Sequence, residues 1–77
     1  MITLIINSFY KQTANGNQYR QIHSNALCYP QEREAIIMDM EDALYEMIEL
    51  HELTHKEKLN YRLWSFAVSE LKIWHNR

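Results

Sequence analysis

Two segments that contain apolar residues lie on either side of a single Asn-Gly pair in the first 28 residues. The segments 2–12 and 18–28 flank Asn15-Gly16 and are interpreted as two strands. Asn-Gly supplies the two positive φ angles of a tight type I′ turn, which joins antiparallel strands. The pattern therefore predicts a β-hairpin over about residues 2–28. Neither face of this hairpin is cleanly polar, so one should cover helices and the other can meet a second chain.

A helical periodicity replaces this pattern after Tyr29. Pro30 suits the first turn of a helix, where its missing N–H is no loss, and Glu32 complements the positive end of the helix dipole. The apolar residues then recur on one side at about 100° per residue. They are Ile36, Ile37, Met40, Ala43, Leu44, Met47, Ile48 and Leu50. The spacing predicts a first helix over about residues 30–52.

A second helix begins with the sequence Thr54-His55-Lys56-Glu57, which has the form of a capping box. Its periodicity predicts a helix over about residues 55–73, antiparallel to the first. Its apolar residues span a wider arc than a half-buried helix needs, so it should contact more than one neighbour. The expected fold is a single α+β domain over residues 1–77, a β-hairpin followed by an antiparallel pair of helices (ββαα).

The length of 77 residues allows one domain, and so short a chain buries a modest core. We therefore expect a homodimer or larger assembly to cover the remaining apolar surface. The single cysteine, Cys28, excludes an intrachain disulfide and suits a reducing compartment. The N-terminus lacks the basic region of a signal peptide, and no apolar run approaches about 20 residues. These features predict a cytoplasmic protein without a membrane anchor.

The net charge of −2 is unevenly distributed. Residues 1–29 carry a net charge of +2. Residues 30–53 carry eight acids against Arg33, a net of −7, and residues 54–77 carry +3. An acidic element between mildly basic ones favours a basic partner.

Two large apolar residues interrupt the polar side of the first predicted helix. Met38 and Tyr45 lie seven residues apart, and acidic residues surround them: Glu41, Asp42, Glu49 and Glu52. Apolar anchors within a charged rim are typical of a protein-binding hot spot, although a charged helix face is also commonly just solvated. The predicted partner is a protein with a basic surface, since acids imitate the phosphates that a nucleic-acid-binding surface expects.

The segment His51-Glu52-Leu53-Thr54-His55 matches the zinc-peptidase pattern H-E-x-x-H. The capping box at Thr54 argues against it, because two zinc-binding histidines must share one helical face. We therefore expect no metal, no cofactor and no catalysis, with a minimal zinc hydrolase using His51, Glu52 and His55 as the alternative.

Other charged residues give weaker signals. Arg33 and Glu70 fall inside the apolar arcs of the two helices and suggest a structural ion pair. Lys11, Arg20 and His23 offer a further alternative, an oligomeric scaffold that binds a small anionic ligand. Lys11 and Arg20 with the aromatic Tyr10 and Tyr19 are too few to indicate a nucleic-acid-binding surface, so no direct nucleic-acid binding is expected. Gly16 is the only glycine, which excludes a phosphate-binding loop.

The chain's small size, the segment FYKQTANGNQYRQIH and the acidic segment EREAIIMDMEDALYEMIELHE resemble accessory proteins of phages and mobile elements. Inhibitors of host defence of the anti-CRISPR type belong to this group. The resemblance is one of general character over the whole chain and identifies no residue by a family motif. It implies a non-enzymatic inhibitor that covers a basic surface of a host protein.

Overall fold

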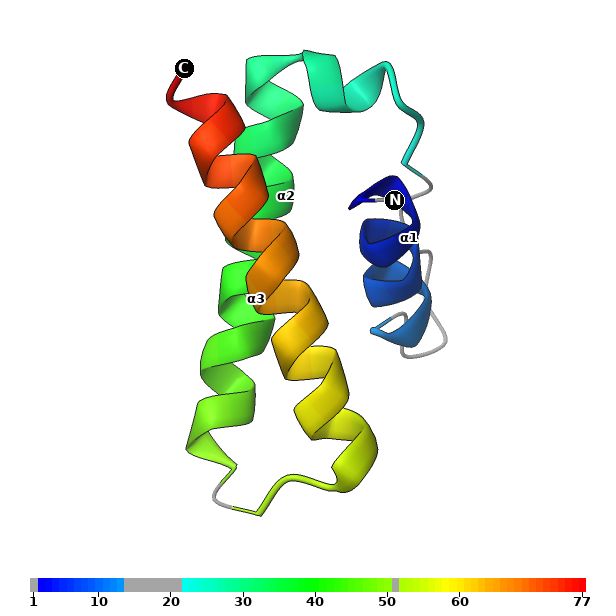
Figure 1. The fold of residues 1–77 in the computed structure, drawn as a ribbon, viewed down its shortest axis with the longest axis vertical. Coiled ribbons are helices and arrows are strands. Elements are labelled where there is room, and N and C mark those ends of the chain that lie inside the picture. Colours follow the sequence, from blue (N-terminus) through cyan, green and yellow to red (C-terminus); the bar gives the residue numbers. More distant parts are fainter. Residues whose placement is uncertain (1, 14–21, 51) are drawn as a thin grey trace.

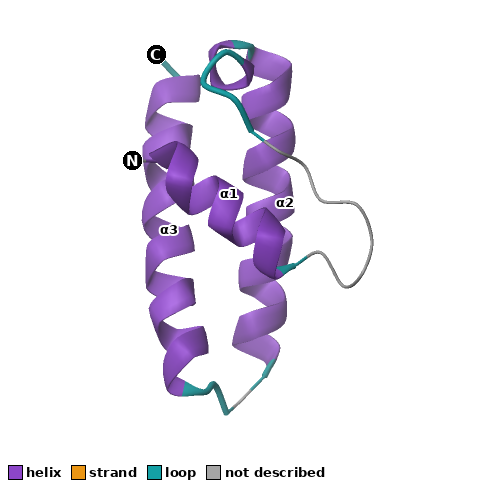
Figure 2. Ribbon diagram, turned by 90° about the vertical axis from the view of Figure 1, so that its right-hand side faces the viewer, coloured by secondary structure: helices purple, strands orange, loops and turns teal. Residues whose placement is uncertain are grey.

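The computed structural model describes residues 2–13, 22–50 and 52–77, and these ranges contain helices and loops but no strand. The helices are α1 (Ile2–Gln12), the short 3₁₀ helix η1 (Ala26–Cys28), α2 (Pro30–Glu49) and α3 (His55–His75). Helices α2 and α3 lie side by side and run antiparallel (Figure 1). Helix α1 crosses both of them obliquely on one side of the pair (Figure 2).

The predicted α+β fold with an N-terminal β-hairpin is therefore wrong. Residues 2–12 form a helix, and residues 22–28 form a loop that ends in η1. The proposed Asn15-Gly16 turn lies outside the described residues. The burial pattern explains the error: Ile6, Phe9 and Tyr10 are buried and Ile2 and Ile5 are partly buried, a spacing of three and four residues. That spacing places them on one face of a helix.

The core lies where α1 meets the α2–α3 pair. The rings of Phe9 in α1 and Trp64 in α3 pack edge to face, with centroids 4.9 Å apart. Aromatic pairs prefer this arrangement because the positive ring edge faces the negative ring plane. The largest completely buried side chains come from all three helices: Ile6, Ile36, Met40 and Leu71. Helix α1 thus covers one face of the α2–α3 pair.

Side-chain hydrogen bonds fix α1 at three points around this core. The Tyr10 hydroxyl donates to the Asp39 carboxylate at 2.5 Å, which ties α1 to α2. The Asn60 amide donates to the Gln12 side chain at 2.6 Å, which ties α1 to α3. The Asn7 amide both accepts from the Ile22 N–H at 2.8 Å and donates to its carbonyl at 3.3 Å. The approach of residue 22 to α1 is therefore set by a side chain that satisfies both backbone groups.

Arg33 is buried, as its place in the apolar arc of α2 predicted, but its contacts differ from the expected pair with Glu70. Its Nη1 donates to the Leu27 carbonyl at 2.7 Å, and its guanidinium lies 4.8 Å from the centroid of the Trp74 ring. Glu70 is exposed on α3. Arg33 therefore contacts the η1 segment and the end of α3 and does not form the expected pair with Glu70.

The helix starts that local signals predicted are confirmed. Pro30 occupies the first turn of α2. At α3 the Thr54 hydroxyl accepts from the Glu57 N–H at 3.2 Å, and the Thr54 N–H donates to the Glu57 carboxylate at 3.1 Å. These hydrogen bonds stabilise the ionised form and lower the pKa of Glu57. The helix ends differ slightly, since α2 ends at Glu49 rather than near residue 52 and α3 continues to His75.

Candidate functional site

The residues predicted for partner binding lie on the exposed side of α2 and just beyond it. Met38 is 58% exposed and Tyr45 is 65% exposed, although the opposite side of the same helix supplies the core. Asp42, Glu49 and Glu52 are exposed as well, although Glu52 follows the end of α2. Glu41 is the exception, because its side chain is only 31% exposed.

Glu41 is partly covered because it pairs with a lysine of the neighbouring helix. The Lys72 Nζ of α3 lies 2.6 Å from a Glu41 carboxylate oxygen. The hydrogen bond and the charge of Glu41 raise the pKa of Lys72. The pair links α2 to α3 on the side away from α1, and it leaves Asp42 and Glu49 as the exposed acids beside Tyr45.

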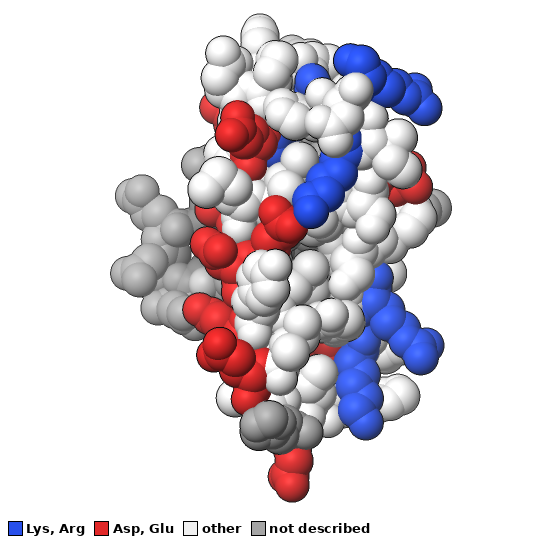
Figure 3. Space-filling view, turned by 90° about the vertical axis from the view of Figure 1, so that its left-hand side faces the viewer, with Lys and Arg blue, Asp and Glu red and all other residues white. Residues whose placement is uncertain are grey.

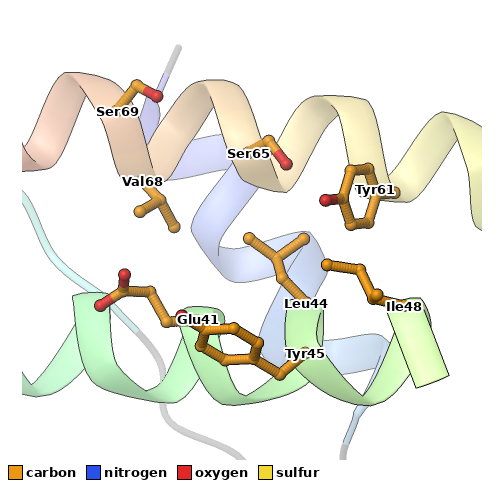
Figure 4. A pocket seen from close by; sticks show the side chains of 8 residues that line it. All are labelled: Glu41, Leu44, Tyr45, Ile48, Tyr61, Ser65, Val68 and Ser69. Carbon is orange, nitrogen blue, oxygen red and sulfur yellow. The ribbon is translucent and has the colours of Figure 1, made fainter.

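A groove runs between α2 and α3 on this side, with a volume of about 280 Å³. Figure 4 shows side chains of both helices along it, with the Tyr45 ring lying beside Glu41. Its lining is Glu41, Leu44, Tyr45, Ile48, Tyr61, Ser65, Val68 and Ser69. Two serines one turn apart on α3 leave room that larger side chains would fill, so the helices do not close the groove.

Charge is distributed unevenly on the two sides of the groove, as Figure 3 shows for this face. Acidic side chains gather along α2 and basic ones lie toward α3, with uncharged residues between them except where the Glu41–Lys72 pair joins the two sides. The exposed acids of α2 are Glu34, Asp39, Asp42, Glu46 and Glu49. We call Met38, Tyr45, Ile48 and the groove, together with the acids Asp42 and Glu49, the acidic groove face.

Two of the three residues of the zinc alternative lie in the described part of the chain. Glu52, which would activate the water, lies between α2 and α3, and His55 is the first residue of α3. His51 lies outside the described residues. Within the ranges that the structure describes, no group of three His, Cys, Asp or Glu side chains is placed to hold a metal ion.

The residues of the anionic-ligand alternative are only partly described. Lys11 is exposed at the end of α1, His23 is exposed in the loop after residue 22, and Arg20 lies outside the described residues. The hairpin that would have brought these three together is absent from the described part of the chain.

The sequence analysis did not predict the groove residues that α3 contributes. Tyr61, Ser65 and Ser69 lie off the apolar stripe of α3 and carry no motif. The available signal was the wide apolar arc of this helix, which showed that several of its faces meet neighbours but did not identify them.

Comparisons with family models, curated proteins and solved structures find no match for this chain. Among the described residues, none of the helices combines the length and apolar character needed to cross a membrane.

Proposed function

We propose that this chain is a non-enzymatic protein-binding module whose acidic groove face docks on a basic surface of another protein. The observation that carries the proposal is the exposure of Met38 and Tyr45 beside Asp42 and Glu49, which, among the described residues, have no cation paired with them as Lys72 is with Glu41. Apolar anchors supply short-range binding energy once water is excluded. The surrounding acids steer association and select basic surfaces.

A nucleic-acid-binding surface of a host protein is the partner class that this face suits best. Such a surface presents Lys and Arg side chains spaced to meet phosphates, and carboxylates on a helix meet the same charges. An inhibitor of the phage type acts by covering that surface. The groove between α2 and α3 then accepts an apolar side chain or a short segment of the partner.

The test begins with capture of the partner from host lysate at low and high salt, followed by rate measurements on the purified pair. Tyr45→Ala should increase the dissociation rate, because it removes an anchor. The matched control is Tyr29→Ala, since Tyr29 is 60% exposed and lies at the other end of α2, before its first turn. Tyr29→Ala should leave both rates close to those of the parent.

Reversing the charge of the exposed acids should change the association rate. Asp42→Lys combined with Glu49→Lys should slow association and make it less dependent on salt, because screening over about 8–10 Å then removes less attraction. Glu46→Lys is the control, since Glu46 lines a different hollow with Gln12 and Thr13 on the α1 side. Unchanged rates in both Tyr45→Ala and the double variant would rule out this face as the partner contact.

A further inference from the structure

A second surface lies on α3, away from the acidic groove face. Leu59, Leu63, Phe66 and Ile73 are between 48% and 55% exposed. With Glu70 and Arg77 they form a row with alternating spacings of four and three residues. That alternation is the seam of a helix that packs along another helix. We call these six residues the outer stripe of α3.

The C-terminal half of this stripe borders a hollow of about 340 Å³. Ile2 of α1 and Phe66, Ile73 and Trp74 of α3 form its apolar walls, and Glu70 and Arg77 complete its lining. The N-terminal half of the stripe instead presents Leu59, which is 48% exposed. One end of the surface thus offers a hollow, and the other end offers an apolar side chain of suitable size.

Two pairs of residues are arranged symmetrically about Phe66, one pair within the outer stripe and one that joins Glu70 of the stripe with Arg62 at its edge. Leu59 and Ile73 each lie seven residues from Phe66, on opposite sides. Arg62 and Glu70 each lie four residues from it, again on opposite sides, and both are exposed. A twofold axis at Phe66 of two antiparallel helices pairs each residue with the mirrored position of an identical copy, so Leu59 would meet Ile73 and Arg62 would meet Glu70.

We infer that a second copy of this chain packs on the outer stripe, with the two α3 helices antiparallel and Phe66 at the twofold axis. Leu59 of each copy then enters the hollow beside Ile73 of the other. Arg62 of each copy faces Glu70 of the other, which supplies a charge partner for the acid in the middle of an apolar row. Parallel packing would instead place Glu70 against Glu70 and Arg62 against Arg62.

The inference does not depend on the proposed function. The outer stripe shares no residue with the groove lined by Tyr61, Ser65, Val68 and Ser69 on α3. The dimer therefore leaves the α2 side of both acidic groove faces, with Tyr45, Asp42 and Glu49, free and doubles the number of partner contacts in one particle.

Charge exchange tests the arrangement by sedimentation equilibrium over the micromolar range. Glu70→Arg and Arg62→Glu should each raise the dimer dissociation constant at least about tenfold, because each places like charges opposite one another. The double variant, with Arg62→Glu and Glu70→Arg together, should restore dimerisation. Glu49→Arg makes the same charge reversal on α2 and should leave the dimer unchanged.

A size change gives a second, independent measurement. Phe66→Ala should yield a monomer of about the parent's chain mass of 9.3 kDa, with circular dichroism confirming that the helices remain. A parent protein that is monomeric throughout the concentration range would overturn the inference. So would a dimer that resists both Glu70→Arg and Phe66→Ala, or a dimer that Tyr45→Ala dissociates, since that result would place the interface on the groove.

Discussion

The two broad faces of the α2–α3 pair both carry apolar side chains but differ in how those side chains are covered. On the face toward α1, polar groups are matched across helices, as Tyr10 with Asp39 and Asn60 with Gln12. On the opposite face, the described residues place nothing over Tyr45 and Ile48, which are 65% and 55% exposed, and the adjacent Asp42 and Glu49 are exposed too. The difference lies in the third helix: α1 covers the apolar side chains of one face, whereas the Glu41–Lys72 pair joins the two helices on the other face without covering Tyr45 and Ile48.

The largest test of this comparison removes an aromatic ring from each face. Phe9→Ala should lower the free energy of unfolding by about 3–5 kcal/mol, because it leaves a cavity beside Trp64. Tyr45→Ala should change the same quantity by no more than about 0.5 kcal/mol. Urea denaturation at a single protein concentration measures both. Comparable losses in the two variants would show that the groove face is packed in solution, and Phe9→Leu gives a milder variant if Phe9→Ala does not fold.

A smaller effect is expected at the edge of the covered face, where Arg33 binds the Leu27 carbonyl. Arg33→Met keeps the length of the side chain but leaves that carbonyl without its donor, at a cost of about 1–3 kcal/mol. Lys58→Met removes an exposed cation of α3 and should fall within about 0.5 kcal/mol of the parent. The denaturation midpoints of the two variants distinguish a structural arginine from a solvated one. Equal midpoints would mean that η1 is held by its apolar contacts alone.

The smallest effect is expected at the start of α3, which belongs to neither face. Thr54→Ala should cost about 1 kcal/mol at neutral pH, because the Glu57 N–H loses its acceptor. The pKa of Glu57 is lowered in the folded state, so its contribution is present above its ordinary value of 4.5 and is lost as pH falls through the lowered value.

The difference in stability between parent and Thr54→Ala should therefore shrink when the pH is taken below 4.5. Thermal denaturation at a series of pH values measures this difference. Glu57→Gln supplies the control, because an amide at this position does not titrate. A difference that stays constant with pH would show that the carboxylate adds nothing to the cap.

Local signals predicted the two long helices well. Pro30 and the capping box at Thr54 satisfy groups within one turn of themselves, so their meaning does not depend on distant contacts. The exposure of Met38 and Tyr45 also followed from their position opposite the apolar stripe of α2. Whether that face binds a protein stays a prediction.

The prediction of a strand for residues 2–12 was wrong for a physical reason. Ile2, Thr3, Ile5 and Ile6 are β-branched and favour strands by propensity, and the Asn-Gly pair strengthened that interpretation. The outcome was decided by packing against Trp64, which is 55 residues from Phe9 in the sequence and leaves no local trace. Helical spacing at positions 2, 5, 6, 9 and 10 was the available signal.

The placement of Glu70 shows a second limit. The apolar arc of α3 is wide enough to contain Glu70, and a wide arc does not reveal which half is covered. The structure buries the side with Trp64, Ala67, Val68 and Leu71 and leaves the side with Phe66 and Ile73 exposed. Only the position of α1 and α2 determines this division.

The crossing of α1 over the pair has a kinetic consequence. Helices α2 and α3 are joined by a short connection, so the contacts near that connection form between residues close in sequence. Contacts between α1 and α3 join residues that are much further apart in sequence, and such contacts form more slowly. We expect the α2–α3 pair to form in the transition state for folding and α1 to dock afterwards. Fractional φ-values near zero for Phe9 and clearly higher ones for Leu71 would show this order. Until α1 docks, both faces of the pair are open to solvent, so the apolar side chains that α1 covers in the native fold are exposed as well.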